Sequence, residues 1–369
     1  MRFKILCFSI LLHVFAGNAF SQHIQPVFKK KEYTDVLAIS FGKYDSIQKL
    51  DITPPEWQFK QVFRSSVKGL DNRFTVWLRN DQNLAIINVR GTVATTASWM
   101  ANVYAAMLPA SGTIKLNDTT TFNYQVAAQK NAYVHAGWLI SLGYIASEVE
   151  QQILLQYARG VKSFIISGHS QGGAITYLLS SHLYYQKKAG KLPSDLIFKT
   201  YCSAAPKPGN LYYAYDFDHI NRDGWAFNIV NAADWVPETP FTIQQFTDLN
   251  PLNPFADIKN ALRSQKLVVR FYAGMVYDKM NKSTRKAAKR YRRYLGHKVG
   301  GRVKKQLPDL KHEPFENSLN YMRAGTPVVL LPAADYFHIF PNDPKGKTGI
   351  WAHHTFDAYW YLLQQQINR

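Results

Sequence analysis

The sequence is poor in cysteine, in acidic residues and in long apolar runs. Of its two cysteines, Cys7 lies in an N-terminal apolar stretch, which leaves Cys202 alone in the rest of the chain. A single thiol excludes a disulfide framework and a cysteine-rich zinc site. Beyond the N-terminal stretch, no segment approaches the ~20 apolar residues of a membrane-spanning helix. The 25 Asp and Glu are outnumbered by 44 Lys and Arg, which gives a formal net charge of +19.

What the chain has instead is material for a large core. Its 369 residues are 46% hydrophobic and 14% aromatic, which excludes a disordered or fibrous protein. A positive excess of this size usually points to an anionic partner, such as nucleic acid, a lipid surface or an acidic polymer. Which of these applies depends on where along the chain the charges lie.

The first residues have the features of a secretory signal peptide. Two basic residues are followed by a mostly apolar run at 5–16, which is too short to span a bilayer comfortably. Ala19 and Ser21 then stand at a plausible cleavage spacing. We therefore predict a signal peptide over residues 1–21 and an exported, soluble mature protein that is secreted, periplasmic or associated with the cell envelope. A buried N-terminal strand or an anchor is the alternative.

Strand-like and helix-like patterns alternate along the rest of the chain. Four short runs have the β-branched and aromatic residues typical of strands buried on both faces, at 84–90, 161–167, 197–204 and 225–230. Two segments between them have helical patterning, 138–157 and 174–185. The alternation predicts an α/β protein with a mostly parallel central sheet flanked by helices, and one domain over residues 22–369.

One segment concentrates the positive charge. Residues 279–305 contain twelve Lys or Arg and no Asp or Glu. Five apolar residues within it, Ala287, Ala288, Tyr291, Tyr294 and Leu295, fall on one helical stripe. We predict a cationic amphipathic helix that Ser283 caps and Gly296 ends, followed by a Gly-rich basic tail. Removing these twelve charges and the two of the signal peptide from +19 leaves only +5 for the rest of the chain.

The strongest motif is Gly-His-Ser-Gln-Gly-Gly at residues 168–173, which lies directly after a predicted strand and directly before a predicted helix. This Gly-x-Ser-x-Gly context is that of a nucleophile elbow. Glycines flank the serine there because the turn is tight and side chains would collide with neighbouring backbone. The turn would hold the Ser170 hydroxyl beside N–H groups at a helix N-terminus, which stabilise negative charge. A plain Gly/Ser turn is the alternative.

A serine nucleophile needs a base and a group that orients this base. Asp234 follows a predicted strand end 64 residues after Ser170, where its carboxylate can accept an imidazole N–H. Four other aspartates are alternatives for this acid, but none follows a strand end so directly, namely Asp216, Asp218, Asp248 and Asp335. For the base, His353 and His354 precede an aromatic helical segment, whereas three other downstream histidines do not, namely His297, His312 and His338.

Further blocks surround these residues in a fixed order, from about residue 80 to the C-terminus. They are Asn-Val-Arg-Gly-Thr-Val-Ala-Thr-Thr-Ala-Ser-Trp at 88–99, Val-His-Ala-Gly-Trp at 134–138, Ala-Ala-Pro-Lys-Pro-Gly-Asn at 204–210, Asp-Trp-Val-Pro at 234–237 and His-Thr-Phe-Asp-Ala-Tyr at 354–359. With the serine motif they resemble the class 3 lipases, the fungal-lipase-like branch of the α/β-hydrolases. The resemblance implies the α/β-hydrolase fold.

Carried over position by position, the resemblance implies a Ser-His-Asp triad. Ser170 would be the nucleophile, Asp234 the acid and His354 the base, because the spacing to Tyr359 favours His354 over His353. The N–H groups of Thr92 and Gln171 would form the oxyanion hole. The family usually has Leu in place of Gln171, which matters little because a backbone N–H does the work. No cofactor or metal is implied.

The resemblance also implies a lid and shows one departure. The lid would cover residues 93–110, with apolar side chains at Trp99, Met100, Val103, Tyr104, Met107 and Leu108; a surface helix packed by its apolar face remains an alternative. The departure is the 120-residue spacing from Asp234 to His354, which we expect to be about half as long in compact members. We expect the extra material, an insertion at about 245–320, to form a cap or flank over the site.

These inferences point to an exported serine hydrolase that cleaves carboxylic esters of lipids, in the manner of a triacylglycerol lipase. A phospholipase A1 or a short-chain carboxylesterase is the alternative among enzymes. A catalytically silent protein that binds anionic surfaces on a hydrolase scaffold is the alternative outside them. For the basic segment 279–305, a solvated helical insertion and docking on an anionic lipid or envelope surface both remain open. Nucleic acid is not expected as a partner, because no nucleic-acid motif accompanies the charge.

Overall fold

A computed structural model of the chain describes residues 24–48 and 58–366. The predicted signal peptide, 1–21, lies outside the described residues. Within them, no helix combines the length and the apolar character that crossing a membrane requires.

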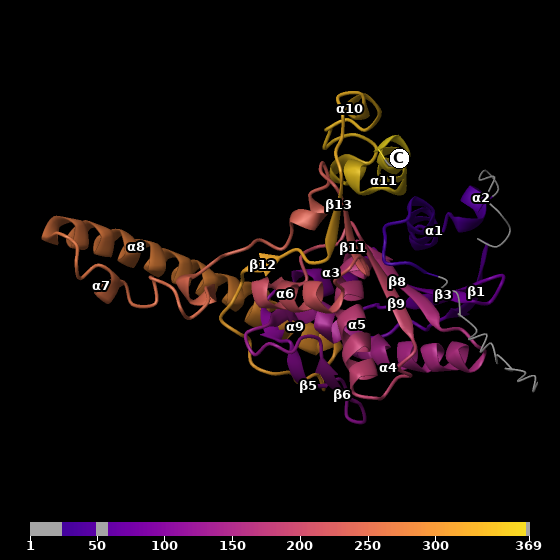
Figure 1. Ribbon diagram of the computed structural model, residues 1–369, viewed down its shortest axis with the longest axis horizontal. Coiled ribbons are helices and arrows are strands. Elements are labelled where there is room, and N and C mark those ends of the chain that lie inside the picture. The colour runs from indigo at the N-terminus through magenta and orange to yellow at the C-terminus, as the bar shows by residue number, and fades with distance from the viewer. Residues whose placement is uncertain (1–23, 49–57, 367–369) are drawn as a thin grey trace, which may run out of the picture.

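A seven-stranded mixed sheet forms the centre of the molecule, in the order β1-β2-β3-β8-β9-β11-β13 (Figure 1). The strands are β1 (Phe59–Arg64), β2 (Phe74–Arg79), β3 (Leu84–Val89), β8 (Ser163–His169), β9 (Ile197–Ser203), β11 (Ala226–Asn231) and β13 (Thr326–Leu330). The strands β1, β2 and β3 pair antiparallel, and all pairs from β3 to β13 are parallel. The four runs predicted as buried strands are therefore present as β3, β8, β9 and β11.

Helices cover both faces of this sheet, which explains why β3, β8 and β11 are buried at every position. On one face lie α4 (Ala136–Ala158), α5 (Gln171–Lys188) and α6 (Leu211–Ile220), and on the other α1 (Lys30–Ser40) and α11 (Phe356–Gln366). Successive side chains of β3 enter the two cores in turn: Ala85 and Ile87 belong to the first, and Leu84 and Ile86 to the second.

Shorter elements surround this centre. A four-stranded sheet has the order β12-β10-β7-β4, with β4 (Met107–Pro109), β7 (Tyr133–His135), β10 (Gly209–Asn210) and β12 (Tyr321–Met322). A hairpin is formed by β5 (Ser111–Lys115) and β6 (Thr121–Gln125). The remaining short helices are α2 (Tyr44–Gln48), α3 (Thr96–Val103), η2 (Val236–Glu238), η3 (Phe246–Asp248), α7 (Ile258–Ala261), α10 (Tyr336–Ile339) and η5 (Gly349–His354).

The basic segment lies in a longer helical stretch than the sequence predicts. Helix α8 (Leu267–Tyr291) continues into the π-helical η4 (Arg292–Lys298) and then into α9 (Val299–Gln306). The predicted ends are wrong, because Ser283 lies inside α8 and Gly296 lies inside η4. Gly296 serves packing instead: a Cβ there would lie 2.9 Å from the Cβ of Ala106. The outer part of α8 extends away from the body together with α7, and only its C-terminal end joins the body (Figure 1).

Candidate active site

Ser170 lies at the sharp turn between β8 and α5. Its backbone has φ 61° and ψ −130°, a conformation that residues other than glycine rarely adopt. The first turn of α5 lies so close to β3 that a Cβ on Gly172 would come within 2.2 Å of the carbonyl oxygen of Val89. The motif thus forms the predicted strand–turn–helix elbow, and glycine at position 172 is a steric requirement.

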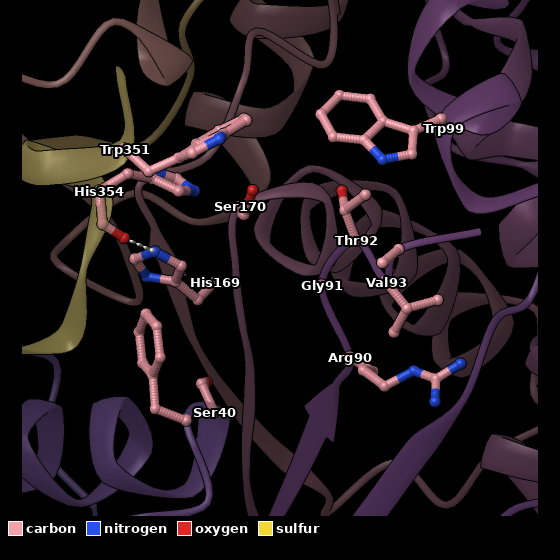
Figure 2. Close-up of a pocket in the computed structure, with 12 residues that line it drawn as sticks. Ser40, Arg90, Gly91, Thr92, Val93, Trp99, His169, Ser170, Trp351 and His354 are labelled. Carbon is pink, nitrogen blue, oxygen red and sulfur yellow. Dashed lines mark hydrogen bonds between the residues drawn. The ribbon is translucent and has the colours of Figure 1, made fainter. Parts of the chain in front are cut away.

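Asp234 and His354 are in direct contact. Asp234 follows β11, is almost completely buried, and its Oδ2 lies 2.6 Å from Nδ1 of His354. With Nδ1–H donated to the carboxylate, Nε2 carries the lone pair of a neutral imidazole. This Nε2 is buried and has no hydrogen-bond partner among the described residues. Figure 2 shows Ser170 in the pocket between His354 on one side and Thr92 on the other. Ser170 and His354 thus line the same pocket, and no hydrogen bond joins the two side chains in the described structure.

The carboxylate of Asp234 is held by two further donors. The N–H of Val236 donates to Oδ1 over 3.0 Å, and the hydroxyl of Tyr359 donates to Oδ2 over 2.9 Å. Tyr359 in turn accepts a hydrogen bond of 3.1 Å from the N–H of Asn231, the last residue of β11. Burial raises the pKa of the Tyr359 phenol well above its usual value, so the hydroxyl stays protonated and donates.

The other candidate residues bond elsewhere. His353 contacts the Tyr336 hydroxyl at 2.9 Å and Oδ1 of Asn342 at 2.7 Å. Since both of its ring nitrogens are engaged there, His353 does not replace His354. The four rival aspartates bond to other partners: Asp216 to Tyr185, Asp218 to the N–H of Gly325, Asp248 to the N–H of Gln245 and Asp335 to Tyr361.

His169, which precedes the serine, contacts the backbone of His354. Its Nε2–H donates to the carbonyl oxygen of His354 over 3.2 Å, and its Nδ1 lies 2.9 Å from the hydroxyl of Ser203. The two imidazole rings lie 4.6 Å apart between centroids. Burial lowers the pKa of His169 well below its usual value, and the neighbouring His354 lowers it further, so the ring is neutral. His169 therefore positions His354 without adding charge.

Thr92 lies across the pocket from His354, just after β3. Its hydroxyl oxygen accepts a hydrogen bond of 2.9 Å from the Asn102 amide. Asn102 is itself oriented by the indole N–H of Trp138, 3.1 Å from its Oδ1. Because the Thr92 oxygen accepts from Asn102, its proton remains available to donate. Asn102 thus links the sequence blocks at 88–99 and 134–138, because it bonds to Thr92 in the first and to Trp138 in the second.

Gln171 begins α5 and turns its side chain toward α3. Its Oε1 accepts from the Ser98 hydroxyl and its Nε2 donates to the Ser98 carbonyl, both over 3.1 Å. The amide therefore fastens α3 to the elbow, a role that leucine could not fill. The backbone N–H of Gln171 lies in the first turn of α5, where helical N–H groups have no partner within the helix.

Two cavities meet at Ser170 and Thr92. One of about 370 Å³ extends toward Phe41 and Arg90 (Figure 2). The other, of about 340 Å³, is walled largely by apolar side chains, among them Trp99, Val103, Trp138, Trp235, Val236, Phe241, Tyr291, Leu295 and Trp351. Sequence reasoning missed Tyr291 and Leu295 as site residues. The available signal was the apolar stripe of the basic helix, which faces this cavity at the junction of α8 and η4.

The chain is similar to known lipases over part of its length. Residues 86–244 match the family model described as Lipase (class 3). The match confirms the resemblance to the class 3 lipases and contains Thr92, Ser170, Gln171 and Asp234, whereas His354 lies beyond it. No curated protein sequence matches the chain.

Solved lipase structures show partial similarity. Rhizomucor miehei triacylglyceride lipase is 23% identical over 57% of this chain and 73% of its own, with a TM-score of 0.39. Lipase II from Rhizopus niveus is 23% identical over 57% and 74%, with the same TM-score of 0.39. The Rhizomucor miehei lipase propeptide complex is 21% identical at a TM-score of 0.38, and the match spans 57% of this chain and 62% of that one.

The region predicted as a lid, 93–110, is partly core. Helix α3 occupies 96–103, and its Trp99 and Val103 are each 42% exposed and line the apolar cavity. Four of the six predicted lid residues are instead buried, namely Met100, Tyr104, Met107 and Leu108. Only the outer face of α3 is thus available to meet substrate. Movement of this helix stays a prediction.

Metal ligands do not gather at this site. In the part of the chain that the structure describes, no group of three or more His, Cys, Asp or Glu is placed to hold a metal ion.

Proposed function

We propose that this chain is a serine hydrolase that cleaves carboxylic ester bonds of lipids through Ser170, His354 and Asp234. The observation that carries the proposal is the hydrogen bond between His354 and Asp234, which leaves a buried, unpartnered Nε2 facing the pocket of Ser170. The class 3 lipase match over residues 86–244 supports an ester hydrolase.

The reaction follows from the roles that these groups can fill. Ser170 Oγ attacks the ester carbonyl while His354 Nε2 takes its proton, and Asp234 stabilises the imidazolium that forms. The N–H groups of Thr92 and Gln171, with the Thr92 hydroxyl, stabilise the oxyanion; losing one such donor typically costs about 10²–10³ in turnover. The C–O bond then breaks, and the alcohol leaves with the proton from His354. Water, activated by His354, releases the acyl group from Ser170.

The apolar cavity favours an acyl chain over a small acid. Its walls are mostly indole, phenyl and aliphatic groups, which bind hydrocarbon and offer few hydrogen bonds. This supports a lipid ester rather than a short-chain ester as the substrate. Hydrolysis of triacylglycerol and of phosphatidylcholine by the same preparation distinguishes a triacylglycerol lipase from a phospholipase A1.

A fluorophosphonate probe tests the mechanism directly. We expect one covalent adduct, mapped by mass spectrometry to Ser170, in the folded wild-type protein and none in Ser170→Ala. Asp234→Asn is the matched variant of the orienting acid and should retain the fold but lose about 10⁴ in kcat, because the imidazole then adopts the wrong tautomer. Ester hydrolysis that survives in Ser170→Ala would overturn the proposal.

Export is part of the proposal and has its own test. The predicted signal peptide 1–21 is expected to be removed during secretion. When the full chain is expressed in a secreting host, N-terminal sequencing of the exported product should begin at Gln22. Retention of the full-length chain in the cytoplasm would contradict export and leave the catalytic proposal intact.

A further inference from the structure

Helices α7 and α8, residues 258–291, form an arm that projects from the body of the molecule (Figure 1). One side of the arm is attached to the preceding segment. The ring of Tyr277 stacks on Phe246 with centroids 4.7 Å apart, and its hydroxyl donates to the carbonyl oxygen of Phe255 over 3.1 Å. These contacts hold one side of the arm, and none of the residues that the structure describes covers the outer end of its other side.

The uncovered side is apolar at the outer end of α8. Leu267, Val268, Phe271 and Tyr272 are exposed by 79%, 80%, 76% and 65%. Their spacing places them on one helical face, opposite Tyr277. Four large apolar side chains exposed together on one helix end are costly in water and indicate a surface that binds something.

The same face becomes basic toward the body. Lys282, Lys286 and Lys289 stand 11, 15 and 18 residues after Phe271, close to whole numbers of helical turns, and all three are exposed. They belong to the segment 279–305, with its twelve Lys or Arg and no acidic residue. One helix face thus carries an apolar end, one exposed acidic residue at Asp278, seven residues after Phe271, and then a row of positive charge.

We propose that this face of α8 docks the protein on anionic lipid surfaces. The apolar side chains at its outer end insert at the boundary of headgroups and acyl chains, and the lysines pair with lipid phosphates. This combination is typical of helices that lie in a bilayer interface. A second copy of the chain would bring the same positive charge and repel, and a nucleic acid would have no use for the four apolar side chains.

Docking here would also orient the active site. Tyr291, the last residue of α8, lines the apolar cavity together with Leu295. It follows Phe271 by 20 residues, or about 30 Å along the helix. A continuous helix therefore connects the lipid anchor to the wall of the cavity. The docking step itself does not depend on the proposed hydrolysis, because binding can be measured without turnover.

Vesicle co-sedimentation with the mature chain tests this inference. We expect strong binding to phosphatidylcholine vesicles containing a quarter of phosphatidylglycerol, weak binding to pure phosphatidylcholine, and loss of the difference in high salt. Each basic residue near an anionic bilayer strengthens binding roughly fivefold. Neutralising three, in K282Q/K286Q/K289Q, should therefore weaken binding to anionic vesicles on the order of a hundredfold.

Matched variants distinguish the contribution of the α8 face to vesicle binding from the effect of removing charge or apolar side chains anywhere on the surface. The control for charge is K130Q/K188Q/K191Q, three exposed lysines on the body, which should change binding by less than about threefold. For the apolar end, L267S/F271S should weaken binding at least tenfold. Its control is L331S/I339S, which alters two side chains that are 63% and 54% exposed elsewhere and should bind like wild type.

Three outcomes would overturn the inference. They are equal binding to neutral and anionic vesicles, unchanged binding by both α8 variants, and equal losses in the body controls. A dimer in sedimentation velocity that L267S/F271S dissociates would assign the face to a second copy instead. Hydrolysis of a soluble p-nitrophenyl ester should remain unchanged in the α8 variants, which shows that they fold. If wild type binds vesicles but hydrolyses no ester, docking stands and the proposed function fails.

Discussion

The hydroxyl of Tyr359 donates a 2.9 Å hydrogen bond to Oδ2 of Asp234, the same oxygen that receives Nδ1 of His354. Tyr359 and Asp234 are both buried, and the Tyr359 hydroxyl also accepts a hydrogen bond from the N–H of Asn231 at the end of β11. Helix α11 is therefore tied to the carboxyl edge of the sheet through the candidate catalytic acid. The base and its orienting carboxylate are thus positioned by one hydrogen-bond network that joins the end of β11 to α11.

Tyr359→Phe removes this hydroxyl without changing the ring. We expect kcat to fall about tenfold with KM unchanged, because the carboxylate loses one of the bonds that orient it toward His354. The free energy of unfolding should fall by about 1–3 kcal/mol, since the buried N–H of Asn231 loses its partner. Steady-state kinetics and urea denaturation measure the two effects. Wild-type kcat in a destabilised Tyr359→Phe would show that the bond is structural only.

Gly172→Ala tests the packing of the elbow. The added Cβ would lie 2.2 Å from the Val89 carbonyl oxygen, so α5 must move away from β3 and displace Ser170. We expect labelling of Ser170 by a fluorophosphonate to fall by at least a hundredfold, with a loss of stability of about 1–3 kcal/mol. The control is Gly301→Ala in α9, where the new Cβ meets no atom within 4 Å. That control should label normally and be slightly more stable, because alanine favours a helix.

His135 makes stability depend on pH. Burial lowers the pKa of His135 to about 3. Its Nε2–H donates to the carbonyl of Asn102 over 3.1 Å, and Nδ1 accepts the N–H of Trp138 at the start of α4. Between pH 6.5 and about 3 the unfolded chain binds a proton here that the folded chain does not. The stability that the neutral His135 contributes is therefore fully present above pH 6.5 and is lost as the pH falls toward about 3.

Urea denaturation between pH 7 and pH 5 measures this linkage. One such proton contributes a slope approaching about 1.4 kcal/mol per pH unit below the unfolded pKa. His135→Gln should be less stable than wild type at pH 7, yet its slope with pH should be smaller by about that amount. Parallel pH dependences in the two proteins would mean that His135 takes up its proton in the folded state as well.

The elements near the serine could be predicted because their signals are local. Ser170 lies in a strand–turn–helix motif, and Asp234 follows an apolar strand. The carboxyl ends of parallel strands share one edge of a sheet, which explains why these residues meet. The choice between His353 and His354 needed the family resemblance, because neighbouring residues share the same local pattern. Only their different contacts, to Tyr336 and to Asp234, separate them in space.

The exposed apolar face of the arm could not be predicted, because exposure depends on whether another element of the fold packs against that face. Apolar residues such as Leu267 and Phe271 are normally buried, and nothing in the sequence says that this part of α8 lacks a covering element. Ser283 and Gly296 are good end signals by residue type, but the helical hydrogen bonds continue through both. The contact of Tyr291 with the cavity of Ser170 joins positions more than a hundred residues apart, which local patterns do not encode.

Leu295, on η4, should set the acyl length that the cavity accepts. It lines the apolar cavity of about 340 Å³, so Leu295→Trp would fill part of the space that a long chain occupies. We expect kcat/KM for a p-nitrophenyl laurate to fall about tenfold or more relative to the butyrate, because each methylene excluded from an apolar pocket costs about 1–3 kcal/mol. Leu154→Trp, at a 42% exposed position of α4 outside the cavity lining, is the matched control and should leave the ratio unchanged. An unchanged ratio in Leu295→Trp would place the acyl chain in the other cavity, toward Phe41 and Arg90.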